Sequence, residues 1–432
     1  MTPQIKQRID QLRSGVVPEG YKKTKVGIVP CEWEENNLGK YLQEYRELSN
    51  DITRYPVYSS SRQGLIPQSQ YYDNREAVET NLGYKIVPTG YVTYRHMSDD
   101  DVFHFNINNT GSEVLVSSEY PVFTSTPKGE LGYIIPLLNN TARFRHFCRM
   151  QKMGGTRTRL YYKNLCEFKA TFPPLAEQKK IAEILAAQDK LIALKEKLIE
   201  EKKRQKKYLM QQLLTGKKRL PGFSGEWEKY SFSEIFTFLS TNTLSRECMT
   251  NEYSEINNIH YGDILTKYTE ILDCKKMQLP YIKNDVIPTG REYIQNGDII
   301  IADTAEDTTV GKAVEIKNIL DKKVLSGLHT MFCRPIEGKF SSGWLGYFLN
   351  SDAFHKQLIP LICGVKVSSI SKKEIVNTII FTPTLEEQSA IVNILSTVDN
   401  ELDLLNRDLD QEKQKKKALM QLLLSGVVRV NV

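Results

Sequence analysis

The stretch PPLAEQKKIAEIL at 173–185 returns 210 positions later as PTLEEQSAIVNIL at 383–395. The likeness continues without a gap over 173–216 and 383–426, where 18 of 44 aligned pairs are identical. YLMQQLLTG at 208–216, for example, is answered by ALMQLLLSG at 418–426. A match of this length indicates a duplicated domain, because solenoid repeats have much shorter periods.

Fainter echoes extend the duplication to the segments between these copies. GYVTYRHM at 90–97 resembles GDIIIADT at 297–304, and EWE occurs at both 32–34 and 226–228. ARFRHFCRMQKMGG at 142–155 likewise resembles DAFHKQLIPLICGV at 352–365. At the start of the chain, IDQLRSG at 9–15 resembles the end of a helical copy, MQQLLTG at 210–216. The sequence therefore predicts two tandem copies of one unit, each a mixed segment followed by a helical one.

The helical segments have the signals of long helices. The first begins after Pro173–Pro174, contains no internal glycine or proline, and ends at Gly216, a suitable C-cap. About forty residues at 1.5 Å each make a rod of about 60 Å. Apolar residues at steps of three and four form a coiled-coil seam in both copies. The residues singled out in the two predicted helices, whose spacer and partner-binding roles are what the family resemblance described below implies, are Leu175, Gln178, Ile181, Leu185, Leu209, Leu213, Leu385, Gln388, Ile391, Leu395, Leu419 and Leu423.

We expect the two helices to pack against each other in antiparallel fashion, because isolated helices this long and polar gain little stability alone. The alternative is two separate surface helices, one on each domain. Antiparallel packing would place the domains at opposite ends and create an approximate internal two-fold axis.

The segments between the helices are rich in Tyr, Val, Ile, Thr, Gly and Asn, with turn signals such as PTG, NNTG and QNGD. The predicted fold class is α+β: two globular domains joined by two long antiparallel coiled-coil helices. The predicted limits are 1–30 for an N-terminal arm, 31–172 and 217–382 for the globular domains, 173–216 and 383–426 for the helices, and 427–432 for a tail.

Composition restricts the class of protein. The chain has 432 residues, 40% of them hydrophobic, with a net charge of +6. This mild positive charge permits nucleic-acid binding without requiring it. Seven scattered cysteines without a CxxC pair indicate reduced thiols, and no segment reads as a signal peptide or a membrane span. We expect a cytoplasmic protein.

The first globular segment contains a basic run at 141–165, with seven Arg or Lys, no Asp or Glu, and interleaved aromatic residues. Such side chains neutralise phosphates, and arginine can bind guanine in a bidentate way. A solvated basic face without a ligand is the alternative. The candidate DNA-binding residues are Arg95, His96, Arg143, Arg145, Arg149, Lys152, Arg157 and Arg159 in the first domain, and Lys356, Lys366, Ser368 and Ser369 in the second.

The sequence lacks the common motifs of catalysis. The sequence has no GxxxxGK[ST] loop, no HExxH and no GxSxG, and its six histidines lack metal-ligand spacing. Asp307 and EIK at 315–317 resemble a nuclease carboxylate–lysine pattern only faintly. We therefore expect no catalytic residues and no bound metal, and a binding or adaptor role.

The twin P-x-L-x-E-Q helices, with EWE, NGDIII at 296–301 and YFLNSDAF…LICG at 347–364, resemble the specificity subunit of type I restriction–modification systems over essentially the whole chain. The first domain departs from the pattern, with PTGYVTY where a GDI-like strand is expected. The resemblance implies that each domain reads one half of an asymmetric, bipartite DNA site, while the helices set the spacer.

The resemblance also implies partners and cofactors. Two modification (methyltransferase) subunits would dock on the helices, and ATP-dependent restriction subunits would join them. S-adenosylmethionine, ATP and Mg²⁺ would belong to those partners. The remaining hypotheses are a coiled-coil scaffold without DNA specificity and, less well supported by the motifs, a stand-alone nuclease or methyltransferase.

Overall fold

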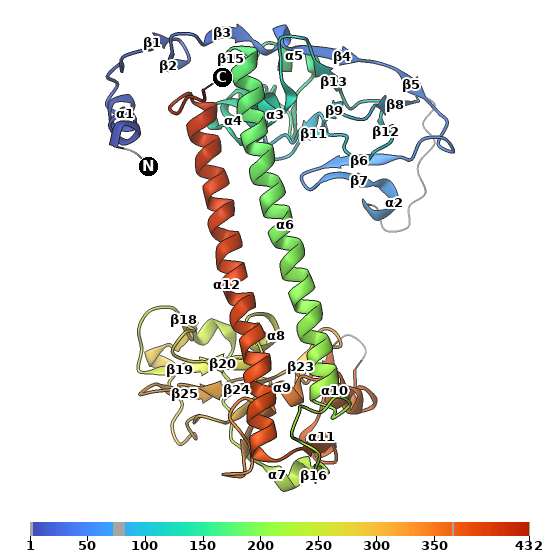
Figure 1. The fold of residues 1–432 in the computed structure, drawn as a ribbon, viewed down its shortest axis with the longest axis vertical. Helices are drawn as coiled ribbons and strands as arrows, with labels where there is room; N and C mark the ends of the chain where they lie inside the picture. Colours follow the sequence, from blue (N-terminus) through green and yellow to red (C-terminus); the bar gives the residue numbers. More distant parts are fainter. Residues whose placement is uncertain (1–2, 72–82, 365–366, 432) are drawn as a thin grey trace. The chain divides into compact units, whose positions relative to one another are not determined.

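The computed structural model describes residues 3–71, 83–364 and 367–431 (Figure 1). The chain forms two compact units: Met1–Glu196 with Asp408–Val432 is unit 1, and Lys197–Arg407 is unit 2. Each unit contains one globular domain and one part of each long helix. In the described ranges no helix is both long and apolar enough to cross a bilayer.

The two long helices are α6 (Leu175–Leu213) and α12 (Leu385–Leu424). Both end in the same way, at a glycine with positive φ: +67° at Gly216 and +70° at Gly426. The amide two residues after each glycine donates back to a carbonyl of the last helical turn, over 3.1 Å in both copies. A Cβ on Gly426 would lie 2.7 Å from the ring of Pro30, so both conformation and space require glycine there.

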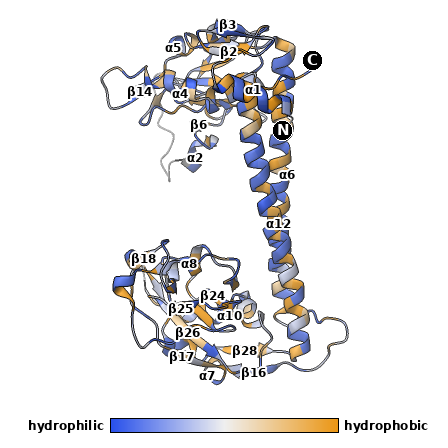
Figure 2. Ribbon diagram, turned by 90° about the vertical axis from the view of Figure 1, so that its left-hand side faces the viewer, coloured by the Kyte–Doolittle hydropathy of each residue, from blue (hydrophilic) through white to orange (hydrophobic). Residues whose placement is uncertain are grey.

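Within each unit the parts of α6 and α12 run antiparallel. In both units, as the residue number rises along α6, the number of its ion-pair partner on α12 falls. The pairs are Asp189–Lys416 and Lys195–Asp408 in unit 1, and Lys202–Glu401 and Lys206–Asp399 in unit 2. The predicted helix packing is confirmed, and the alternative of two separate surface helices is wrong. Figure 2 shows hydrophobic and hydrophilic residues alternating along both helices, as a packed seam requires.

The apolar seams continue into the domain cores. In unit 1, Ile181 and Leu185 of α6 join Leu423 of α12 in the core of the first domain. In unit 2, Leu213 of α6 and Leu395 of α12 belong to the core of the second domain. Each domain therefore needs one end of both helices to complete its hydrophobic interior.

The first domain is built from short strands and helices. Its larger sheets have the orders β11-β9-β13-β4 and β12-β8-β5, and β1-β2, β3-β15, β6-β7 and β10-β14 are two-stranded. The strands are β1 (Tyr21–Thr24), β2 (Gly27–Pro30), β3 (Glu34–Asn37), β4 (Leu42–Tyr45), β5 (Leu48–Ser49), β6 (Tyr58–Ser61), β7 (Gly64–Pro67), β8 (Tyr84–Val87), β9 (Val92–Thr93), β10 (Met97–Ser98), β11 (Asn106–Ile107), β12 (Val114–Ser117), β13 (Val122–Ser125), β14 (Thr158–Arg159) and β15 (Lys169–Phe172). The helices are α1 (Pro3–Arg13), η1 (Leu38–Lys40), α2 (Gln68–Tyr71), α3 (Leu131–Asn140), α4 (Ala142–Arg149) and α5 (Tyr162–Cys166).

The second domain has a five-stranded sheet of order β17-β26-β22-β24-β20 and a four-stranded sheet of order β18-β21-β19-β25, with β16-β28 and β23-β27 as two-stranded pairs. The strands are β16 (Glu228–Ser231), β17 (Phe236–Leu239), β18 (Met249–Thr250), β19 (Ile256–Ile259), β20 (Ile271–Asp273), β21 (Tyr281–Ile282), β22 (Ile299–Ala302), β23 (Thr304–Ala305), β24 (Ala313–Lys317), β25 (Lys323–Ser326), β26 (Thr330–Pro335), β27 (Ser368–Ser369) and β28 (Ile379–Thr382). The helices are α7 (Phe232–Ile235), η2 (Arg246–Cys248), α8 (Tyr261–Thr266), η3 (Asn284–Val286), α9 (Trp344–Leu349), α10 (Asp352–Leu358), η4 (Ile359–Leu361) and α11 (Lys372–Ile375).

The duplication is visible in local chemistry as well as in element order. Thr141 caps α4 by accepting from the amide of Phe144, and Ser351, 210 residues later, caps α10 by accepting from the amide of Phe354. The elements that follow also keep the 210-residue offset, since β14, α5 and β15 recur as β27, α11 and β28. The mixed α+β copies predicted from sequence are thus confirmed.

Candidate nucleic-acid interface

The repeated P-x-L-x-E-Q phrase places a buried glutamine at the start of each long helix. In unit 1 the side-chain oxygen of Gln178 accepts from the amide of Glu130 (3.0 Å), and its Nε2 donates to the carbonyl of Pro173 (3.0 Å). In unit 2, Gln388 accepts from the amide of Ser341 (2.8 Å) and donates to the carbonyl of Pro383 (2.9 Å). Both glutamines fasten the start of a helix to the adjacent domain.

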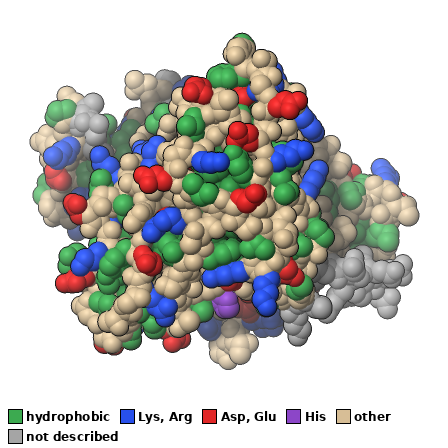
Figure 3. Space-filling view, turned by 90° about the horizontal axis from the view of Figure 1, so that it is seen from below, with side chains coloured by type: hydrophobic (Ala, Val, Ile, Leu, Met, Phe, Trp, Pro, Cys, Tyr) green, Lys and Arg blue, Asp and Glu red, His purple; other side chains and the backbone are tan. Residues whose placement is uncertain are grey.

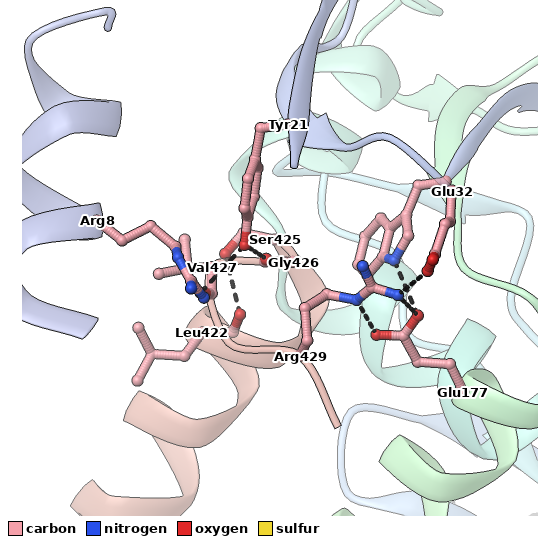
Figure 4. A network of polar contacts seen from close by, with 10 residues as sticks. Arg8, Tyr21, Glu32, Glu177, Leu422, Ser425, Gly426, Val427 and Arg429 are labelled. Carbon is pink, nitrogen blue, oxygen red and sulfur yellow. Dashed lines mark hydrogen bonds and ion pairs between the residues drawn. The ribbon is translucent and has the colours of Figure 1, made fainter. Parts of the chain in front are cut away.

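The glutamate of the same phrase forms a second repeated contact, which we call the socket: Glu177 with Arg429 and Trp33 in unit 1, and Glu387 with Arg219 in unit 2, where Trp227 lies beside the arginine. Arg429 donates to both oxygens of Glu177, and Trp33 Nε1 adds a bond of 3.1 Å (Figure 4). In unit 2, Arg219 donates to both oxygens of Glu387.

The tryptophan of each EWE phrase lies at a socket: Trp33 donates to Glu177, and Trp227 lies beside Arg219. The guanidinium of Arg219 lies 5.8 Å from the ring centroid of Trp227. Hydrogen bonding to Glu177 raises the pKa of Arg429, and hydrogen bonding to Glu387 raises that of Arg219.

Figure 4 also shows Arg8 and Tyr21 reaching the chain just after α12, where the Tyr21 hydroxyl donates to the carbonyl of Gly426 (2.7 Å).

The repeated phrase included Glu177 and Glu387, but the sequence pattern did not predict their arginine partners, Arg219 and Arg429. A signal was present, because the arginines are also 210 residues apart, each three positions after the glycine that ends a helix. Of the residues predicted to contact partners, most are buried in the chain's own core, so a partner would meet other faces of the helices. The buried ones are Gln178, Ile181, Leu185, Leu213, Gln388, Ile391, Leu395 and Leu423; Leu175, Leu209 and Leu419 are half-buried, and Leu385 is exposed.

The candidate DNA-binding residues of the first domain fall into two groups. One group lies at a two-stranded ribbon of β10 and β14, the first ribbon, in which Met97 pairs with Arg159 and Ser98 with Thr158. Its members are Arg95, His96, Arg157 and Arg159. The sequence separates these residues by more than sixty positions, and the antiparallel ribbon brings them together.

The other group is on and after α4, so the basic run at 141–165 does not form one surface. Arg143 donates to the carbonyl of Val26 (3.0 Å), and Arg143 and Arg145 line a groove of about 710 Å³ beside the end of α12. Arg149 and Lys152 are exposed at and beyond the end of α4.

Aspartates balance part of the positive charge near the first ribbon. Arg157 forms an ion pair with Asp99 (2.7 Å), and Arg62, from the turn between β6 and β7, pairs with Asp100 (2.5 Å). Arg62 and Asp99 line a cleft of about 480 Å³ between the β6–β7 hairpin and β10, together with Arg95 and His104. The cleft presents both donors and acceptors, the combination needed to read base edges.

His96 is buried and lies against the exposed Tyr161, with ring centroids 5.6 Å apart. Burial lowers the pKa of His96 below its ordinary value, and the nearby Glu119 only partly offsets this. His96 is therefore neutral at pH 7 and does not act as a cation toward phosphates.

The second domain has an equivalent ribbon of β23 and β27, the second ribbon, in which Thr304 pairs with Ser369 and Ala305 with Ser368. Lys356 is exposed on α10, and Lys366 lies outside the described residues. Asp303, which precedes β23, is 3.7 Å from His329. On the face shown in Figure 3, Lys and Arg side chains alternate with Asp and Glu and do not form a single positive patch.

Among the described residues, no cluster of His, Cys, Asp and Glu could hold a metal ion. The most strongly perturbed carboxyl is that of Glu315, whose pKa burial raises to about 7. It accepts from the amides of Gly343 and Gly346 at the start of α9, so its role is structural. Asp307, which belongs to the faint nuclease pattern, accepts hydrogen bonds from the hydroxyl and the amide of Thr309.

Residues 40–204 and 224–413 match the family described as type I restriction modification DNA specificity domain. The chain is 27% identical to the type I restriction enzyme MjaVIII specificity subunit of Methanocaldococcus jannaschii, over 95% of this chain and 96% of that protein.

Two solved structures have a similar fold. One comes from a study of complex assembly and conformational transition of the type I R-M system (TM-score 0.55, 16% identity, 93% of this chain and 99% of that one). The other is the type I restriction-modification S subunit from M. genitalium (TM-score 0.50, 12% identity, 90% of this chain and 96% of that one).

Proposed function

Because this chain belongs to the family of type I restriction modification DNA specificity domains, we propose that it reads a DNA site in two parts, one with each globular domain. The observation that carries this proposal is the pair of ribbons at equivalent places in the two copies. Arg159 on the first ribbon and Ser369 on the second are 210 residues apart and differ in charge. Unlike side chains on like frames favour two different half-sites, and therefore an asymmetric target.

The long helices would dock two modification subunits, one for each copy of the repeat. Leu194 on α6 and Leu404 on α12 are 210 residues apart, and their side chains are 56% and 64% exposed. Apolar side chains this exposed at matching places are what two identical partners would recognise. Restriction subunits would join this assembly.

The cofactors would belong to those partners. Methyl transfer would use S-adenosylmethionine on the modification subunits, and DNA translocation would use ATP and Mg²⁺ on the restriction subunits. The chain itself would supply recognition and positioning, with no catalytic step of its own. The family match supports this DNA-specificity function and gives no support to a scaffold without DNA specificity.

The helices would also set the spacer between the half-sites. Each of them has residues in both units, and ion pairs along the seam fix their register in each unit. A change in helix length should therefore change the distance between half-sites and leave the half-sites themselves unchanged.

The proposal is tested by expressing the chain with its modification subunit in a host whose DNA is otherwise unmethylated. Single-molecule sequencing of the host DNA should then show methylation at one bipartite, asymmetric sequence. Deleting the gene for this chain should remove that methylation. Methylation that persists without the chain, or that occurs at a single continuous palindrome, would contradict the proposal.

A further inference from the structure

A small hollow at the edge of the first ribbon has the side chains needed to read a base pair. It has a volume of about 390 Å³ and is lined by His96, Met97, Glu119, Arg159 and Tyr161. Four of these five residues belong to or flank the ribbon, and Glu119 comes from the turn between β12 and β13. The fold therefore brings a carboxylate and a guanidinium to the lining of one hollow, although 40 residues separate Glu119 from Arg159 in the chain.

Arg159 differs from the neighbouring arginines in its partners. Arg157 is held by Asp99 and Arg62 by Asp100, whereas no partner for the guanidinium of Arg159 is found among the described residues. Arg159 and Tyr161 are both exposed, and both line the hollow. The donors of Arg159 are therefore available to a ligand in the hollow.

Glu119 has unused acceptor capacity. Its side chain is 60% exposed, and its nearest recorded polar partner is His96 Nε2 at 3.9 Å, too far for a hydrogen bond. The carboxylate can therefore accept from an amino group that enters the hollow. The amide of Tyr120 donates to the carbonyl of Ser117 (2.9 Å), a backbone contact that defines the turn carrying Glu119.

Tyr161 and His96 form a firm wall on one side of the hollow. Tyr161 is 53% exposed and stacks on His96, whose side chain is 6% exposed. The buried Nδ1 of His96 has no hydrogen-bond partner. Stacking on the buried His96 holds the ring of Tyr161 in place. The exposed face of this ring can therefore pack against a base or a thymine methyl group.

We propose that this hollow reads one G·C base pair of the half-site recognised by the first domain, with Arg159 donating to the guanine and Glu119 accepting from the cytosine. In the major groove, guanine presents the acceptors O6 and N7, and cytosine presents the donor N4. A guanidinium and a carboxylate that line one hollow supply the donors and the acceptor that this pattern requires. The inference rests on the proposed function and goes beyond it by naming the residues and the base pair.

The second domain supports this assignment by contrast. At the position of Arg159 it has Ser369. Asp303 and His329 lie beside the second ribbon, and Asp303 occupies the position that His96 has in the first domain. The carbonyls of His96 and Asp303 accept from the equivalent amides of Leu160 and Ile370. In the first domain the histidine, His96, is next to the ribbon and the acid is Glu119. In the second domain the acid, Asp303, is next to the ribbon and the histidine is His329. The second domain should therefore not select G·C at the equivalent position.

The test uses the whole chain in complex with its modification subunits and measures methylation on a pool of duplex DNA randomised at each half-site position. Arg159→Lys keeps the positive charge and loses the bidentate geometry. Glu119→Gln keeps the shape and adds donors. Glu113→Gln, which alters an exposed carboxylate elsewhere in the first domain, is the matched control.

We expect Arg159→Lys and Glu119→Gln each to lower discrimination by about 5- to 150-fold at one and the same base pair, which is G·C in the wild type. The other positions and the second half-site should be unchanged, as should all positions in Glu113→Gln. Retained discrimination in Arg159→Lys would make this residue a phosphate contact and overturn the inference, as would effects of the two variants at different base pairs. A wild-type complex without any sequence preference would overturn the proposed function, and this inference with it.

Discussion

Arg429 and Glu177 are joined by two hydrogen bonds, of 2.6 and 2.9 Å, although 252 residues separate them in the chain. Arg219 and Glu387 form the same two-bond pair in the other unit, over 2.7 Å for each bond. Both glutamates are buried, so each pair fastens the segment that follows one long helix to the start of the other. The repeat thus preserves a joint as well as a helix.

Removal of one partner from this joint should be costly. Glu177→Ala would leave the indole N–H of Trp33 without its acceptor and Arg429 with Glu32 as its remaining carboxylate, and we expect a loss of about 1–3 kcal/mol in the free energy of unfolding of unit 1. Chemical denaturation followed by tryptophan fluorescence would measure it.

The matched variant is Glu387→Ala, which should destabilise unit 2 instead. A double-mutant cycle with Arg429→Ala separates the pair from the single side chains. If Glu177→Ala and Arg429→Ala proved strictly additive, the two residues would not act as a pair.

The repeat also offers a matched comparison along the helix seam. Lys206 pairs with Asp399 and Glu270, over 2.7 and 2.6 Å, and its side chain is only 11% exposed. The equivalent Lys416 pairs with Asp189 in a more open setting. Burial lowers the pKa of Lys206, but its two acidic neighbours outweigh this and raise it, so Lys206 is charged.

Lys206→Ala should therefore destabilise unit 2 by about 3–5 kcal/mol, because it leaves two carboxylates without their cation. Lys416→Ala should cost about 0–1 kcal/mol in unit 1. Denaturant midpoints of the two variants give the comparison directly. Equal losses would mean that burial of the Lys206 cluster has no energetic consequence.

Glu315 predicts a dependence of stability on pH. Its pKa is raised to about 7 in the folded protein, against an ordinary value of 4.5, because the carboxyl is buried. Below about pH 4.5 the group is protonated in both states. Between about pH 4.5 and 7 the folded state retains a proton that the unfolded state has lost, so stability falls as pH rises, by on the order of 3 kcal/mol in total. Above about pH 7 this contribution stays constant.

The measurement is the difference in unfolding free energy between wild type and Glu315→Gln at several pH values from 4 to 8. Since glutamine does not titrate, the difference isolates this carboxyl from the rest of the protein. We expect the wild type to lose stability relative to the variant as pH rises. A difference that is flat over this range would remove Glu315 as a source of pH dependence.

Helix length gives a direct test of the spacer hypothesis. Seven residues, two turns of a coiled coil, can be inserted in α6 after Glu196 and in α12 after Arg407, where neither inserted segment interrupts the ion pairs on its two sides. The insertion adds about 10.5 Å to both helices and should lengthen the methylated site by about three base pairs. Methylation mapping would detect this change, and an unchanged spacer would contradict the hypothesis.

An insertion in α6 alone is the control for helix pairing. It shifts the register against α12, and we expect loss of the folded complex instead of a longer spacer.

Much of the architecture was predictable from the sequence. The 210-residue repeat predicted the two long helices and their packing, and the composition and turn signals of the segments between them predicted mixed α+β domains. These features depend on local periodicity, or on a likeness that can be read along the chain.

The candidate site was less predictable, because it depends on contacts between distant residues. The basic run at 141–165 suggested one surface, but α4 directs Arg143 and Arg145 to a groove beside α12, while β14 places Arg159 in the hollow. Glu119 lies outside the basic run and outside the sequence phrases that are alike in the two copies, and only the fold brings its carboxylate to the ribbon. A composition-based search for cations could not have found an acceptor of this kind.

The buried Lys206 cluster has a consequence for local opening of the helix pair. Tyr347 donates to Asp399 (2.6 Å), so the seam in unit 2 is bonded to α9 of its own domain. In the Lys416–Asp189 pair the aspartate is exposed and the lysine half-buried, and within the described residues the pair has no such bond to a domain helix. Amide hydrogens of α12 should consequently exchange with solvent deuterium more slowly around Asp399 than around Lys416, which makes the unit 1 part of the pair the first to fray.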